Sequence, residues 1–193
     1  MQYIKQHLRK KILEVSLDEF DKNGFEGASM RAIAEGTGTA LGNLYRYFKN
    51  KDDLYQKCLS PVLVDCIALT ENVFGVSEEA IAQNARHMAK FVVEHQREFR
   101  IMLQGPAKHY NEFLERFTHC VSRQLEAHAR EAGSDAYVNP GFFDAISLAF
   151  ISSLRQIMEN AHSEQETARY VLELMQFMFS DFDGRLKRLG GTV

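Results

Sequence analysis

The sequence contains no tryptophan, only three prolines, and three cysteines that form no Cys-X-X-Cys pair. The scarcity of proline and the lack of a Val/Ile/Thr-rich alternating stretch argue against strands and favour helices along the whole chain. An odd number of unpaired cysteines argues against a disulfide framework. We therefore expect Cys58, Cys66 and Cys120 to be buried thiols in a reducing cytoplasm.

The sequence also lacks a long hydrophobic run. The charge-free segment of the C-terminal half, residues 145–154, is far shorter than the ~20 apolar residues that a membrane span needs. The N-terminus carries Lys5, Arg9, Lys10 and Lys11 with no apolar core after them, so it does not resemble a secretion signal. These features predict a cytoplasmic protein with no membrane partner.

Residues 29–51 have the pattern of two short helices joined by a glycine turn. Ser29 is a suitable N-cap for the first helix, and Gly38 adopts the positive φ of a tight turn without steric cost. Leu44 and Phe48 then recur at helical spacing, which leaves polar and aromatic side chains on the outer face. This is the layout of a helix-turn-helix, in which one helix crosses the DNA backbone and the next enters the major groove. A solvated amphipathic hairpin with chance aromatics is the alternative.

The net charge of −3 is unusual for a protein that binds DNA, but the charge is unevenly distributed. The first 57 residues hold ten Lys/Arg against eight Asp/Glu, a net charge of +2, and the remainder carries −5. Positive charge therefore gathers in the part of the chain that contains the helix-turn-helix pattern, where phosphates would be met. This excess of positive charge agrees with the helix-turn-helix pattern, but by itself it is too small to indicate DNA binding.

The segment from Leu44 to Leu54 reads Leu-Tyr-X-Tyr-Phe-X-Asn-Lys-X-X-Leu and resembles the tetracycline-repressor (TetR) family of one-component regulators. Further similar residues are Ile12-Leu13, Phe20, Asn23-Gly24-Phe25, Met30 to Ala34 and Gly38. The resemblance covers about the first quarter of the chain. It implies an all-α fold of about nine helices, with a three-helix helix-turn-helix head in residues 1–50 and a larger effector-binding and dimerisation body in residues 51–193.

The resemblance also implies which side chains face DNA. We assign phosphate contacts to Tyr45, Tyr47 and Lys51, base-edge contacts to Arg31, Asn43 and Arg46, and the rest of the surface to Leu41 and Gly42. The chain departs from the usual family pattern at Gly36, Thr37, Thr39 and Ala40. Gly36 lies inside the expected second helix and weakens it by up to ~1 kcal/mol relative to alanine.

The first helix is expected over residues 3–22, with Asn23-Gly24 as its stop. Asn50 is a good N-cap for the fourth helix, which contains Pro61. A proline inside a helix removes a hydrogen bond, which predicts a kink or break near Ser60 and a hinge between head and body. A plain helix end, with a new helix starting at Pro61, fits the sequence equally well.

Five further helical stretches are predicted after the fourth helix: residues 77–97, 99–103, 107–132, 141–161 and 164–189. Residues 135–140 are the most loop-like part. The last two stretches have apolar faces wider than a single surface helix buries against its own core. Two such helices from each of two subunits would form a four-helix interface, and the resemblance implies a homodimer of this kind. Packing within the monomer alone is the alternative.

An aromatic group in the body suggests a site for an apolar or aromatic effector, with His95, Tyr110 and His119 as polar anchors. A filled core explains any one of these residues equally well. The candidate ligand-binding residues are Phe91, His95, Phe99, Met102, Tyr110, Phe113, Phe117, His119 and Phe143.

No catalytic or cofactor-binding motif is present. The seven histidines form no metal-ligand spacing, and neither a P-loop nor a nucleophile-elbow pattern occurs. We expect no enzyme, no cofactor and no metal. The sequence predicts a dimeric, ligand-responsive transcriptional regulator, a repressor that binds a palindromic double-stranded DNA operator and is released by a small molecule. An all-helical adaptor that has lost DNA binding is the main alternative, and a helical enzyme is a weaker one.

Overall fold

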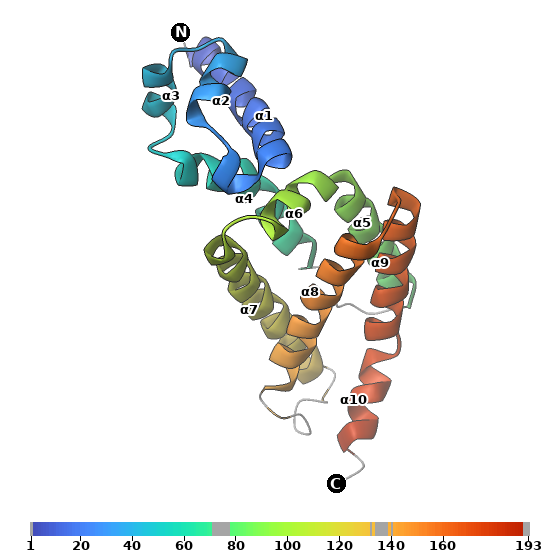
Figure 1. The fold of residues 1–193 in the computed structure, drawn as a ribbon. Helices are drawn as coiled ribbons and strands as arrows, with labels where there is room; N and C mark the ends of the chain where they lie inside the picture. The colour runs from blue at the N-terminus through green and yellow to red at the C-terminus, as the bar shows by residue number, and fades with distance from the viewer. Residues whose placement is uncertain (1, 71–77, 132, 134–138, 140, 191–193) are drawn as a thin grey trace. The chain divides into compact units, whose positions relative to one another are not determined.

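The computed structural model describes residues 2–70, 78–131, 133, 139 and 141–190 (Figure 1), and all structural statements concern these residues. They form ten helices and no strand, as the predicted all-α fold requires. None of these helices is long and apolar enough to cross a membrane. The helices are α1 (Gln2–Gly27), α2 (Met30–Thr37), α3 (Leu41–Tyr47), α4 (Lys51–Thr70), α5 (Glu78–Glu94), α6 (Gln96–Leu103), α7 (Ala107–Glu131), α8 (Phe142–Asn160), α9 (Glu164–Phe179) and α10 (Phe182–Gly190).

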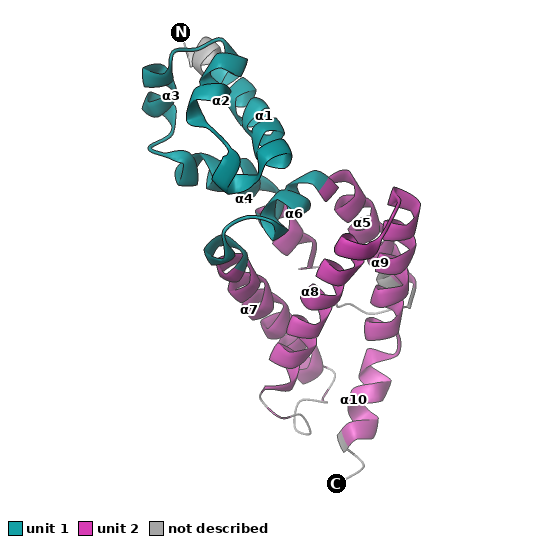
Figure 2. Cartoon of the chain, viewed as in Figure 1, with its two compact units in different colours: residues 1–63, 97–110 teal, residues 64–96, 111–193 magenta. Residues whose placement is uncertain are grey.

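The helices group into two compact units, coloured separately in Figure 2. Unit 1 comprises residues 1–63 and 97–110, and unit 2 comprises residues 64–96 and 111–193. All of α6 lies within the predicted body of residues 51–193, and most of it, from Arg97 onward, belongs to the same compact unit as α1 to α3. The domain boundary at residue 50 stays a prediction. The predicted helix start at Ser77 and most of the predicted loop at 135–140 lie outside the described residues.

Unit 1 is built around aromatic side chains of α1 and α4. Phe20 and Phe25 both meet the ring of Tyr55 edge-on, with ring centroids 5.1 Å apart in each case. Phe25 can reach Tyr55 because α1 changes direction at Gly24, which has φ 66° and ψ 175°. A residue with a side chain adopts this left-handed φ only at a cost, so glycine suits the position. The predicted stop at Asn23-Gly24 is thus a break, after which the chain makes another helical turn to Gly27.

Salt bridges fix α6 to α1 within unit 1. Arg100 donates two hydrogen bonds to the carboxylate of Asp21, at 3.0 and 3.1 Å. One turn earlier, Arg97 donates to Asp18. Because these charged groups are partly exposed, the contacts contribute little to the free energy of unfolding. Their two-pronged geometry instead fixes how the two helices are oriented. They fix the face of α6 that lies on α1.

Buried polar contacts connect α4 to the last turn of α6 and to the first turn of α7. The hydroxyl of Tyr55, which is completely buried, donates to the backbone carbonyl of Ile101 at 2.9 Å. This bond satisfies a carbonyl in the last turn of α6, and burial raises the pKa of the Tyr55 phenol above its usual value. His109, itself buried, makes a 2.6 Å contact from Nε2 to the carboxylate of Asp52 in the first turn of α4. Unit 1 therefore contains residues 97–110 as an integral part.

Helix α4 continues without interruption from Lys51 to Thr70, through Pro61. The predicted break near Ser60 and the alternative of a new helix starting at Pro61 are both wrong. Leu59 and Val62, on either side of the proline, are buried. Burial of such side chains stabilises by ~1.5–3 kcal/mol each and offsets the hydrogen bond that proline removes.

The core of unit 2 contains a ladder of phenylalanines from three helices. Phe117 of α7 stacks on Phe150 of α8 at 6.1 Å between centroids, and Phe150 meets Phe179 of α9 edge-on at 5.5 Å. Helix α5 packs along α9, and α8 also packs against α9. The wide apolar faces predicted for the last two stretches are therefore partly used within the chain.

The final helical stretch was predicted to be continuous over residues 164–189, but it is two helices. Asp181 adopts a left-handed φ of 49°, which ends α9 before α10 begins at Phe182. Aspartate tolerates this conformation better than most residues. Hydrogen bonds from Arg188 and from the backbone of Gly184 to the Asp181 carboxylate lower its pKa, so the charged form is favoured at the start of α10.

The cysteines follow the predicted pattern in part. Cys58 and Cys66 are buried, and burial raises the pKa of each thiol to about 12. Cys120 is only half-buried. Since thiolate is the reactive form, the two thiols of α4 are protonated and inert at neutral pH.

The close approach of Gly105 to Tyr55 gives a direct test of the unit 1 core. A Cβ at Gly105 would overlap the Tyr55 hydroxyl and lie 3.1 Å from the Ile101 carbonyl oxygen. We predict that Gly105→Ala lowers the free energy of unfolding by ~1–3 kcal/mol, as measured by urea denaturation. Gly27→Ala is the control, since its methyl meets only an ordinary 3.5 Å contact; equal stability of the two alanine variants would contradict the account.

Candidate nucleic-acid interface and ligand cavity

Helix α2 is fixed at both ends by the interactions that its sequence predicts. The Ser29 side chain accepts hydrogen bonds from the backbone of Arg31 and Ala32, at 3.2 and 3.4 Å. Gly38 ends the helix in the left-handed region, with φ 70°. The Ser29 cap and the glycine turn are therefore confirmed.

The glycine inside α2 has a packing role that the sequence did not reveal. A Cβ on Gly36 would lie 2.9 Å from the Cγ1 atom of Val15 on α1. A side chain at this position would push α2 away from α1. Gly36 thus lowers the intrinsic stability of α2 as a helix, but it allows α2 and α1 to pack closely.

Helix α3 is anchored through one face and open on the other. Leu44 is completely buried, and Phe48 just after the helix is 1% exposed. On the opposite side Leu41 and Tyr45 are 38% and 48% exposed, and Arg46 is also exposed. An anchored helix that presents aromatic and cationic side chains to solvent is suited to a groove of DNA.

Asn43 lies in the first turn of α3 with its side chain already oriented. Its amide nitrogen donates to the hydroxyl of Thr39 at 2.8 Å. One further N–H and the amide oxygen of Asn43 stay available, which is the combination that reads adenine. Thr39 was noted in the sequence only as a departure from the family pattern, and the structure shows what it contacts.

The other predicted DNA-facing residues differ in their availability. Arg31 is exposed and forms a 3.5 Å ion pair with Glu35, one turn along α2. Gly42 is exposed, and Tyr47 is half-buried. An exposed ion pair contributes little to stability, so Arg31 can exchange Glu35 for another anion at small cost.

Lys51 has intramolecular partners that sequence reasoning missed. Its ammonium donates to the backbone carbonyls of Glu26 and Ala28, at 3.1 and 3.2 Å, and lies 4.7 Å from the ring centre of Phe25. The lysine therefore caps the C-terminal end of α1 from the start of α4. Asn50 caps α4 as predicted, since its side chain accepts from the backbone of Asp53 at 2.8 Å. One of the three ammonium protons of Lys51 is left for a phosphate.

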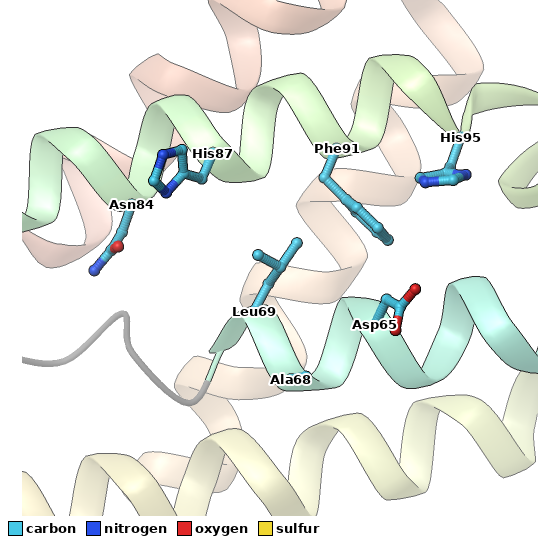
Figure 3. Close-up of a pocket in the computed structure, with 7 residues that line it drawn as sticks. All are labelled: Asp65, Ala68, Leu69, Asn84, His87, Phe91 and His95. Atoms are coloured by element: carbon cyan, nitrogen blue, oxygen red, sulfur yellow. The ribbon is translucent and has the colours of Figure 1, made fainter.

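The nine predicted ligand-binding residues separate into different environments. Phe91 and His95 line a cavity of about 500 Å³ in unit 2 (Figure 3). The other seven residues are not among those that line this cavity. Phe99, Met102 and Tyr110 belong to unit 1, and Phe113, Phe117 and Phe143 are buried in unit 2. His119 is exposed.

Five lining residues of the cavity were missed by the sequence reasoning. They follow one stripe on each of two helices: Asp65, Ala68 and Leu69 on α4, and Asn84 and His87 on α5. On α5 the spacing of three and four residues continues through Phe91 and His95. This spacing was visible in the sequence, but nothing local indicated that α4 would lie opposite. Among the described residues no group of three His, Cys, Asp or Glu side chains could hold a metal ion.

A glycine turn that joins a capped helix to an anchored, solvent-facing second helix defines unit 1 as a helix-turn-helix domain. Comparison with known proteins agrees. Residues 12–58 match the family model described as "Bacterial regulatory proteins, tetR family". The resemblance to this family noted in the sequence is thus confirmed over the helix-turn-helix segment.

Curated relatives match a segment of the chain of similar length. The chain is 44% identical over 52 residues to the HTH-type transcriptional repressor KstR of Rhodococcus jostii, a match that covers 27% of this chain and 24% of that protein. It is 46% identical over 46 residues to an HTH-type transcriptional regulator of Staphylococcus aureus, or 24% of this chain and 25% of the relative. The matches therefore span about a quarter of the relatives' length. These relatives are transcriptional regulators and not enzymes.

Solved structures extend the likeness to the whole fold. A putative TetR-family regulator from Syntrophomonas wolfei superposes with a TM-score of 0.73 at 20% identity, over 90% of this chain and 96% of that one. SmeT, the repressor of the Stenotrophomonas maltophilia multidrug efflux pump SmeDEF, gives 0.70 at 16% identity, over 89% and 88%. At such low identity these likenesses establish the fold alone.

The capping role of Lys51 predicts a loss of stability when the side chain is removed. Lys51→Ala leaves two carbonyls at the end of α1 without their charged donor, so we expect the free energy of unfolding to fall by ~1–3 kcal/mol. Lys49→Ala is the matched control, because Lys49 lies two residues away and its side chain is exposed. This variant should change the free energy of unfolding by less than ~0.5 kcal/mol. Chemical denaturation measures both. If the two variants are equally stable, Lys51 does not hold α1.

Proposed function

We propose that the chain is a transcriptional regulator that binds a palindromic DNA operator through α2 and α3, as a homodimer, and acts as a repressor. The observation that carries this proposal is the exposed face of α3, where Tyr45 and Arg46 project from a helix anchored by buried Leu44 and Phe48. The family match covers this same segment. Arg31, Asn43 and Arg46 are the proposed base readers, and Tyr45, Tyr47 and Lys51 the proposed phosphate contacts.

The test is a salt-dependent titration of labelled DNA from upstream of the gene, followed by fluorescence anisotropy. Binding through phosphates predicts an affinity that falls steeply with salt, and unlabelled non-specific DNA should compete poorly. Arg46→Ala should weaken binding at least tenfold. The control is Arg123→Ala, an exposed arginine on α7 in unit 2, which should bind like the unaltered protein. No binding of any of these DNAs, even at low salt, would favour the adaptor alternative.

A dimer is proposed because α8 and α9 pack together and each exposes a large apolar side chain. Phe177 on α9 is 80% exposed and Leu148 on α8 is 46% exposed. Apolar groups this open are typical of a surface that another subunit covers. A helix-turn-helix head reads only a half-site, so a palindromic operator needs two copies.

Phe182, at the start of α10, is unsuitable as a test of the dimer. It is only 9% exposed and packs 6.3 Å from the ring of Phe179 within the same chain. A charge at Phe182 would therefore damage the core of unit 2 whether or not the protein is a dimer. Phe177 is the sharper choice.

We predict that Phe177→Glu converts a dimer to a monomer without unfolding it, because the side chain is already exposed in the single chain. Light scattering should give twice the chain mass of 22.1 kDa for the unaltered protein and the chain mass for the variant. The exposed Lys187→Glu, on α10, controls for the added charge. A mass of one chain for the unaltered protein at micromolar concentration would remove the dimer.

A small-molecule effector is proposed to bind the cavity between α4 and α5. Helix α4 carries Lys51 in its first turn and Asp65, Ala68 and Leu69 in its last turns, so one helix holds a proposed DNA contact and part of the cavity wall. An effector releases DNA only if it binds the DNA-incompetent arrangement better. A hundredfold difference corresponds to ~2.7 kcal/mol.

A further inference from the structure

The cavity of unit 2 has a distinctive distribution of charge. Among the described residues that line it, Asp65 is the one carboxylate, His87 and His95 are the other ionisable side chains, and there is no lysine or arginine. Lys90, next to Phe91 in the sequence, is exposed and forms a 3.6 Å ion pair with Glu94, and neither residue lines the cavity. The described lining therefore presents a carboxylate with no lysine or arginine beside it.

Apolar and aromatic surface adjoins this carboxylate. Figure 3 shows Asp65 on α4 facing the part of α5 that carries Phe91 and His95, with Leu69 farther along α4. Phe91 and Leu69 are half-buried, so each still offers part of its surface to a ligand. An aromatic face beside a carboxylate is the combination that attracts organic cations, since both the ring quadrupole and the negative charge favour a positive group.

The other ligand classes fit less well. An anion would find no guanidinium or ammonium partner among the described residues that line the cavity and would approach Asp65 with like charge. A purely apolar ligand would remove water from Asp65 without giving it a partner, which is costly. A bare metal ion lacks ligands, because no group of three suitable side chains exists among the described residues.

We propose that the cavity binds a lipophilic organic cation, with its positive group facing Asp65 and its apolar part against Phe91 and Leu69. The volume of about 500 Å³ lies within the range of sites for drug-sized molecules. This inference rests on the proposed function in one respect only, namely that the bound cation acts as the effector that releases DNA. The binding itself requires no DNA.

The test uses two probes of the same shape and opposite charge, tetraphenylphosphonium and tetraphenylborate, titrated calorimetrically into the full chain without DNA. The phosphonium should bind at least tenfold more tightly than the borate. Asp65→Asn should abolish this preference, and Phe91→Leu should weaken phosphonium binding several-fold. Asp144→Asn, at an exposed aspartate in the first turn of α8, is the matched control and should keep the preference.

Three outcomes would overturn the proposal: equal or tighter binding of the borate, no binding of either probe, or an unchanged preference in Asp65→Asn. Circular dichroism and thermal melting of each variant identify any that fail to fold, and Asp65 is exposed, so Asp65→Asn is expected to fold. Operator titrations of the ligand-free protein are run separately. If the protein fails to bind DNA but still binds phosphonium through Asp65, the proposed function is rejected and the cavity proposal stands. If it binds the operator but shows no Asp65-dependent phosphonium binding, the cavity proposal is rejected and the proposed function stands.

Discussion

The buried phenol of Tyr55 is the contact on which the architecture of unit 1 depends. Its ring fills the space between the two parts of α1, and its hydroxyl satisfies the last turn of α6 through Ile101. Because Tyr55 lies in the second turn of α4, its position also fixes where α4 starts. The start of α4 in turn sets Asn50 and Lys51, the residues that follow directly after the proposed reading helix.

Local signals in the sequence were sufficient for the helix ends of the site. The Ser29 cap, the left-handed Gly38 and the Asn50 cap each depend on residues within four positions along the chain. The same holds for the anchors Leu44 and Phe48, whose burial follows from helical spacing. The helix-turn-helix could therefore be predicted closely from the sequence.

Features that depend on distant residues could not be predicted in this way. Lys51 caps carbonyls 23 and 25 residues earlier, and the Tyr55 bond spans 46 residues. Pro61 stays helical because its neighbours are buried, a tertiary effect that outweighs the local preference. The cavity likewise needs two stripes from separate helices, and only Phe91 and His95 of its lining were anticipated from composition.

The proposed reading helix α3 has a firmly packed base, and one helix, α4, carries both the proposed DNA contact Lys51 and part of the cavity wall. The central claim is that α3 reads bases. Selection of binders from a random pool of double-stranded DNA, followed by sequencing, tests it most directly. The account predicts enrichment of an inverted repeat, and Asn43→Ala should select the same spacing with the preference relaxed at one position in each half, by ~1–3 kcal/mol. No enrichment by the unaltered protein, or an identical preference in the variant, would contradict it.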